Sequence, residues 1–81
     1  MEPPLHPGDF VREDVVAPLA ISVAEAARRA GVEPGYLEDL LACRVAVNLE
    51  AAAGLAALAG NSVGFWMGLQ AEYDRANPPG P

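Results

Sequence analysis

This chain of 81 residues has five arginines, no lysine and eleven acidic residues. A guanidinium group suits phosphate recognition because its planar N–H donors match pairs of phosphate oxygens. Arg28, Arg29 and Arg44 lie within or just after residues 22–41, and Arg12 lies upstream. These arginines are therefore the candidate phosphate contacts. The alternative for Arg28 and Arg29 is a solvated helix face that favours the negative end of the helix.

Carboxylates in the same stretch oppose this chemistry. Glu33, Glu38 and Asp39 would approach phosphates of like charge, and the formal net charge of −6 argues against a nucleic-acid partner. A glutamate can also accept a hydrogen bond from the amino group of cytosine. Glu38 is thus predicted either to contact a base or only to repel DNA.

The other reactive side chains do not form a catalytic pattern. His6 is the only histidine and Cys43 the only cysteine, and no spacing of titratable groups suggests a nucleophile with its base. His6 is expected to cap a helix or lie at the surface. One cysteine allows no internal disulfide and no thiolate pair for a metal. We therefore predict no enzyme activity, no cofactor and no metal.

The sequence is also consistent with a cytoplasmic protein that has no membrane span. Its amino terminus lacks the basic and apolar segments of a secretory signal. The apolar stretch 40–59 contains Arg44, Asn48 and Glu50, which are costly in hydrocarbon.

The arginines and carboxylates of residues 22–41 must be positioned by two helices. Ser22 and Glu25 have the spacing of a capping box, in which each side chain bonds the backbone amide of the other residue. Ala27 and Gly31 share one face and leave room for a crossing helix, and Gly31 can end the first helix in the left-handed conformation. This pattern predicts a helix-turn-helix, with a bare helical hairpin as the alternative.

The whole chain is predicted to be all-α with five helices. Pro18 is expected to end the first helix, and Asn48 and Ser62 to cap the last two. Residues 1–5 are expected to be a flexible arm, residues 6–76 the domain and residues 77–81 a disordered tail. The predicted helices are Gly8–Ala17, Val23–Ala30, Gly35–Ala42, Leu49–Ala59 and Val63–Ala76. The predicted core comprises Phe10, Val15, Leu19, Ala27, Val32, Leu37, Leu40, Leu55 and Phe65.

Four blocks of sequence resemble one family. They are residues 6–9 with 12–14 and 18–19, residues 22–32, the alanine-rich helix ending at Gly60, and the segment 62–74, which contains Phe65-Trp66, Leu69-Gln70 and Tyr73-Asp74. Together they are similar to the HigA antitoxins, small helix-turn-helix proteins with the lambda-repressor-like fold. The resemblance implies a homodimer that binds a DNA operator upstream of its own genes and neutralises a ribonuclease toxin.

Departures from the family concentrate on the surface expected to meet DNA. The family usually presents serine, arginine, asparagine or glutamine on the second helix of the motif, where this chain has Gly35, Glu38, Asp39 and Ala42. Basic residues common on the fourth helix are replaced here by Gly54 and Ala57, and a frequent glutamine is Val23.

Two functions from different classes follow. The first is a DNA-binding antitoxin and transcriptional autorepressor, with a DNA-contacting set of Arg28, Arg29, Tyr36, Glu38 and Arg44. The second is a helix-turn-helix protein that acts as a protein-interaction module without strong DNA binding, which the acidic second helix favours.

Two further predictions concern single positions. Cys43 stands where the family often has a helix-ending glycine, so we expect either a positive φ there or a helix that ends differently. Trp66, Leu69 and Tyr73 are expected to form a dimer interface, because the last helix offers more apolar surface than a small core needs. The alternative is that Trp66 and Tyr73 complete the core of the monomer.

Overall fold

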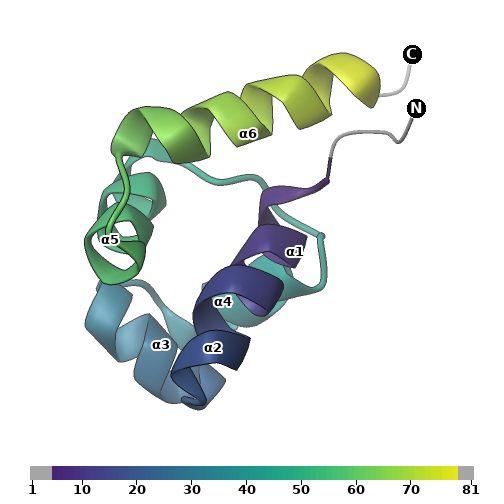
Figure 1. Cartoon of the computed structure of the whole chain (residues 1–81). Coiled ribbons are helices and arrows are strands. Elements are labelled where there is room, and N and C mark those ends of the chain that lie inside the picture. The colour runs from purple at the N-terminus through teal and green to yellow at the C-terminus, as the bar shows by residue number, and fades with distance from the viewer. Residues whose placement is uncertain (1–4, 79–81) are drawn as a thin grey trace.

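The computed structural model describes residues 5–78. Within that range all regular secondary structure is helical. The helices surround a common core, which confirms the predicted all-α fold (Figure 1). Their bounds are α1 Pro7–Val11, η1 Arg12–Val16, α2 Ala17–Leu19, α3 Val23–Ala30, α4 Pro34–Leu41, α5 Leu49–Ala59 and α6 Val63–Ala76. Because α1, η1 and α2 are consecutive, they form one segment and the count of five helices holds. None of these helices is long and apolar enough to cross a membrane.

The predicted arm and tail fall largely outside the described residues, which exclude 1–4 and 79–81. Leu5 is exposed, and Asn77 and Pro78 follow the end of α6.

The first helical segment passes through Pro18 instead of ending before it, so that prediction is wrong. In a regular helix a proline ring clashes with the carbonyl four residues earlier. One widened turn relieves this clash, because η1 is a π-helix in which the Ala17 N–H donates to the Arg12 carbonyl, five residues earlier. The segment ends after Leu19 at Ala20, which has a left-handed φ of 54°.

The other helices begin at or within one residue of their predicted positions, and most have a side-chain cap. Ser22, Asn48 and Ser62 each accept a bond from the amide three residues on, at 3.1, 2.8 and 3.1 Å. His6 caps α1 through Nδ1, which accepts from the Gly8 N–H at 2.9 Å. These bonds satisfy amides that the helix itself leaves free.

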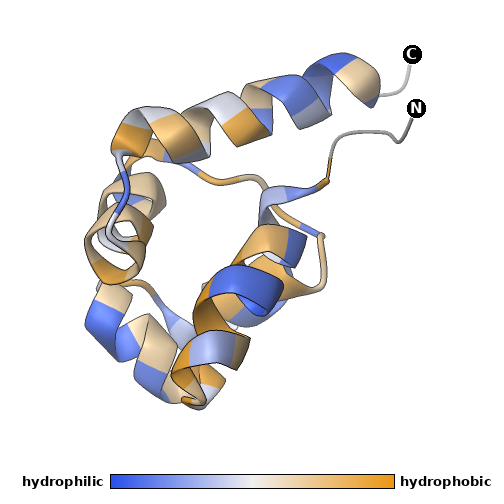
Figure 2. Ribbon diagram, in the orientation of Figure 1, coloured by the Kyte–Doolittle hydropathy of each residue, from blue (hydrophilic) through white to orange (hydrophobic). Residues whose placement is uncertain are grey.

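The core is built from many small and a few large apolar residues. Figure 2 shows that apolar residues occur in every helix of the fold. The prediction is confirmed for Val15, Ala27, Leu37, Leu40 and Leu55, which are buried. Phe10, Val32 and Phe65 are only partly buried against this core. The prediction is wrong for Leu19, which lies at the end of the first segment with 44% of its surface exposed.

Candidate nucleic-acid interface

The α3–α4 pair forms the predicted helix-turn-helix geometry around Gly31. Gly31 has φ 71°, and its N–H donates to the Arg28 carbonyl at 3.3 Å. The Val32 N–H donates to the Ala27 carbonyl at 3.0 Å, which completes a Schellman turn. Ala27 is fully buried and has only a methyl group, so it allows the close packing of α3 with α4 and α5.

The carboxyl end of α4 is closed by Cys43 in the left-handed conformation, with φ 62°. The Cys43 N–H donates to the Leu40 carbonyl and the Arg44 N–H to the Asp39 carbonyl, both at 2.9 Å. This is again a Schellman turn, here with a cysteine at the position that usually holds glycine. The prediction of a positive φ at Cys43 is confirmed. Burial raises the pKa of the Cys43 thiol, and the nearby Asp9 carboxylate adds a smaller effect in the same direction.

The loop 42–48 carries Arg44 and is held at two points. The Tyr36 hydroxyl donates to the Ala46 carbonyl at 2.6 Å, and the Val47 N–H donates to Oε1 of Gln70 at 2.8 Å. Desolvation raises the pKa of the half-buried Tyr36. Because its hydroxyl hydrogen is engaged within the protein, Tyr36 positions the loop that carries Arg44.

Arg28 and Arg29 lie in the last turn of α3 and share one carboxylate. Glu25 Oε1 accepts from Arg28 Nε at 3.1 Å, and Oε2 accepts from Arg29 Nε at 2.7 Å and also from Arg28 Nη2. These bonds lower the pKa of Glu25 to about 2, with the larger effect from Arg28 and the smaller from Arg29. The capping box is therefore only half confirmed: the Glu25 amide bonds Ser22 Oγ, but the carboxylate turns toward the arginines.

The remaining arginines are also paired with carboxylates of the same chain. Arg44 Nη1 lies 3.5 Å from Oδ1 of Asp39, and Arg12 Nη1 lies 3.1 Å from Oδ1 of Asp9. Arg75 pairs with Glu72 on α6. Every arginine of the chain thus has an acidic partner. Such pairs are solvent-exposed and weak, so a phosphate can compete for the guanidinium groups.

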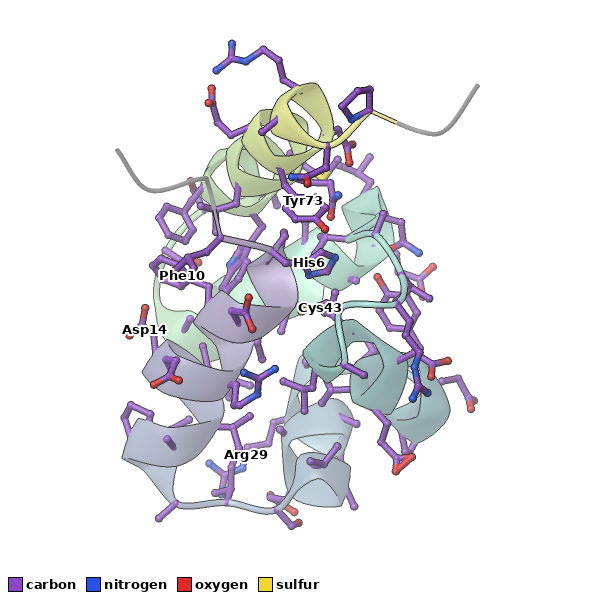
Figure 3. All side chains as sticks on the ribbon, turned by 90° about the vertical axis from the view of Figure 1, so that its right-hand side faces the viewer. His6, Phe10, Asp14, Arg29, Cys43 and Tyr73 are labelled. Atoms are coloured by element: carbon purple, nitrogen blue, oxygen red, sulfur yellow. The ribbon has the colours of Figure 1, made fainter. Side chains whose placement is uncertain are left out.

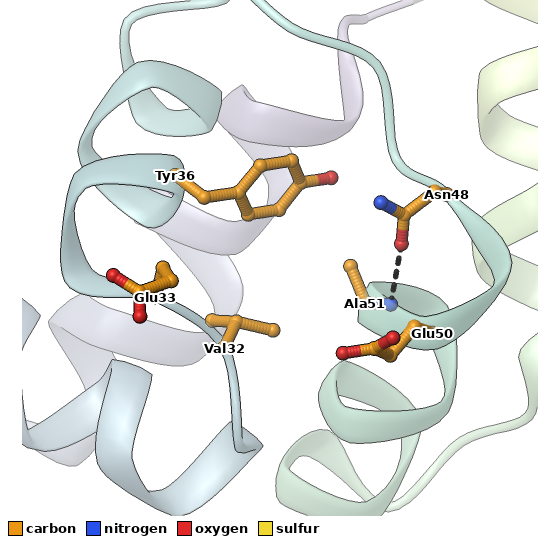
Figure 4. A pocket seen from close by; sticks show the side chains of 6 residues that line it. All are labelled: Val32, Glu33, Tyr36, Asn48, Glu50 and Ala51. Carbon is orange, nitrogen blue, oxygen red and sulfur yellow. Dashed lines mark hydrogen bonds between the residues drawn. The ribbon is translucent and has the colours of Figure 1, made fainter.

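Acidic side chains also flank a pocket of about 210 Å³ between the start of α4 and the start of α5 (Figure 4). Glu33 and Glu50 lie at its sides and are exposed, and Val32 and Ala51 provide apolar lining. Analysis of the sequence alone did not single out Glu50 for this surface. The available signal was that Glu50 lies in the first turn of α5, two residues after the cap Asn48, which also lines the pocket.

The predicted DNA-contacting residues fall into two groups. Tyr36 and Glu38 are on α4, and Arg44 is joined to α4 through Asp39. Arg28 is on the face of α3 opposite the buried Ala26 and Ala30, whereas Arg29 lies on the flank of the helix. Figure 3 shows Arg29 on the side of α3 toward α2 in this view, with α4 on the other side. Tyr36 thus contacts the loop that carries Arg44, whereas Arg28 and Arg29 pair with Glu25 of their own helix.

Comparison with known proteins identifies the family. No family model matches the chain. The antitoxin HigA of Pseudomonas aeruginosa, solved with the higBA promoter, is 32% identical, and the match covers 90% of this chain and 79% of that one with a TM-score of 0.85. The chain belongs to the HigA family of antitoxins. This similarity favours the helix-turn-helix over a bare helical hairpin.

Two further proteins are similar to this chain. The antitoxin GraA is 29% identical, with 93% of this chain and 81% of that chain covered and a TM-score of 0.86. Among curated proteins, the virulence-associated protein I of Dichelobacter nodosus is 25% identical over 72 residues, which is 89% of this chain and 67% of that protein.

The last HigA-like block, on α6, serves mainly to hold the domain together. Trp66 is fully buried, packs edge-on against Phe10 and Phe65, and donates from Nε1 to Asn61 at 2.6 Å. Its assignment to a dimer interface is wrong, because its ring does not reach the surface. Gln70 is buried and links the loop 42–48 to α6. The sequence did not indicate this anchoring role, although Gln70 lies in the HigA-like segment 62–74.

Gly54 departs from the HigA pattern for a reason of packing. A Cβ atom at Gly54 would lie 1.8 Å from the Ala30 carbonyl oxygen. The backbones of α5 and α3 are therefore in direct contact where the two helices cross. The position is not an outward one from which a basic side chain could reach DNA.

Proposed function

We propose that this chain is a cytoplasmic DNA-binding antitoxin that represses transcription from its own operator. The observation that carries the proposal is the match to the HigA structure solved with its promoter, at 32% identity and a TM-score of 0.85. A second Pseudomonas aeruginosa structure, solved with its 28-bp operator DNA, is also 32% identical. We assign the chain no catalytic activity and no cofactor.

The proposed DNA contacts divide by chemistry. Arg28, Arg29 and Arg44 contact phosphates, since guanidinium groups are exposed at all three positions. Glu38 is exposed on α4 and is the proposed contact to a base. Tyr36 supports the contact made by Arg44, because its hydroxyl bond holds the loop 42–48.

We further propose that the active form is a homodimer and that it binds a toxin. Two half-sites contacted by two copies would double the small number of phosphate contacts that one copy offers. Leu69 and Tyr73 are half-buried on α6 and remain the candidates for the dimer interface.

The test is a gel-shift series with the native upstream region and a scrambled duplex of the same composition, each across a range of salt. We expect preferential binding of the native region and steep loss of affinity with salt. Non-specific binding should be no tighter than about 10⁻⁴ M at physiological salt, because the acids oppose the few arginines. Failure to bind the native region even at low salt would overturn the proposal.

A paired variant examines the role of the acids on α4. Glu38→Gln with Asp39→Asn should raise affinity for both duplexes if these carboxylates only repel phosphates. If Glu38 contacts a cytosine, the same change should abolish the preference for the native region.

A further inference from the structure

The Glu25 carboxylate lies between two guanidinium groups instead of completing the helix cap. Both of its oxygens accept hydrogen bonds, with Arg28 on both oxygens and Arg29 on one. Its side chain is only 30% exposed, although it is on the outer face of α3. One negative charge is thus shared by two positive charges.

This arrangement has the chemistry of a small anion site. A guanidinium group binds a carboxylate and a phosphate in the same two-pronged geometry. The low pKa of Glu25, about 2, means that its carboxylate is charged at neutral pH. After Glu25 is paired, the two arginines retain one net positive charge, which still attracts a stronger anion.

We propose that Arg28 and Arg29 form a site for one phosphodiester group and that Glu25 occupies this site in the free protein. A phosphate must then displace Glu25, which makes Glu25 a positioning residue that limits affinity. The identity of the phosphate as operator DNA rests on the proposed function; the site itself does not. Exposed ion pairs are weak, so displacement is feasible and costs at most about fivefold in affinity per protomer.

The first experiment compares Glu25→Gln with Glu72→Gln in DNA binding across salt. Glu72→Gln is a matched control, because it removes the same charge and releases an arginine three residues on, but on α6. We expect Glu25→Gln, and not Glu72→Gln, to tighten binding by up to about fivefold per protomer at low salt. The same change in a background with Arg28→Ala and Arg29→Ala should give no gain. An equal gain in that background would overturn the proposal, because it would reflect general charge and not the site.

The second experiment needs no DNA. Inorganic phosphate is titrated while NMR follows the side-chain Nε–H signals of Arg28 and Arg29. In Glu25→Gln these signals should shift at phosphate concentrations that leave the wild type and Glu72→Gln unchanged. Equal responses in all three would overturn the site, whereas loss of DNA binding alone would overturn only the proposed function. If Glu25→Gln melts below the assay temperature, Glu25→Ala replaces it.

Discussion

At the scale of single residues, Cys43 holds a conformation that suits glycine. A side chain at positive φ costs conformational energy, and glycine removes that cost while adding some freedom to the unfolded chain. Cys43→Gly should therefore stabilise the domain by up to about 1 kcal/mol, measured by urea unfolding.

The control for Cys43→Gly is Ala57→Gly, which places the same residue at an exposed position inside α5. It should destabilise by about 1 kcal/mol, since glycine is a poor helix former. A Cys43→Gly protein that is as destabilised as this control would contradict the strain at Cys43.

Glu25 should shape the response of the domain to acid. Its pKa lies near 2 in the folded protein against an ordinary value of 4.5, so its contribution to stability is present above pH 4.5 and is lost as the pH falls toward 2. Melting midpoints of Glu25→Gln should therefore fall less steeply over that interval than those of the wild type. Removing both arginines should flatten the curve in the same way, whereas curves parallel to the wild type would contradict the ion pairs.

Sequence could predict the first of these two residues but not the second. Cys43 was recognisable because a helix followed by a family glycine position implies a left-handed residue. From its position in α3, the Glu25 side chain can reach the Ser22 amide, Arg28 or Arg29. Sequence spacing alone does not say which of these groups it bonds.

At the scale of helices, Gly54 fixes the crossing of α5 over α3. A methyl group there would overlap the Ala30 carbonyl, and backbone on both sides resists movement. Gly54→Ala should cost at least about 1–3 kcal/mol in thermal or urea unfolding.

Gly68→Ala is the matched control on α6, where an added Cβ meets no atom within 4 Å. It should stabilise the domain by about 0.5–1 kcal/mol, because alanine favours a helix more than glycine. Similar effects for the two substitutions would refute the backbone contact at Gly54.

Helix positions were predictable where side chains mark the ends. Ser22, Asn48 and Ser62 located the starts of α3, α5 and α6, because such oxygens satisfy free amides. The first segment was misjudged at Pro18, since a π-turn absorbs the clash that normally ends a helix. That accommodation depends on the backbone of the preceding turn, which residue types do not specify.

At the scale of the molecule, α6 should separate folding from self-association. Trp66→Ala removes a fully buried ring and should cost about 3–5 kcal/mol of stability. Leu69→Ala alters a half-buried side chain and should weaken the homodimer with a smaller effect on unfolding. Sedimentation at micromolar concentration, together with urea unfolding, checks both; a wild-type protein that sediments as a monomer would exclude the dimer.

The fate of Trp66 shows the limit of sequence at this scale. Its helix spacing is compatible with either the core or an exposed stripe, and the choice depends on how far Phe10 and the first segment reach across α6. The Gln70 bond to the loop 42–48 is equally non-local, so no pattern along the chain indicated it.

The pairing of every arginine with an acid has a consequence for how the protein would find its operator. Basic repressors spend much of their time sliding on unrelated DNA, held there by phosphate contacts. This chain has a net charge of −6 and its cations are already engaged, so it should rarely linger on such sequences. We expect it to search for its operator mainly by free diffusion, so that few copies are held on unrelated DNA at any moment.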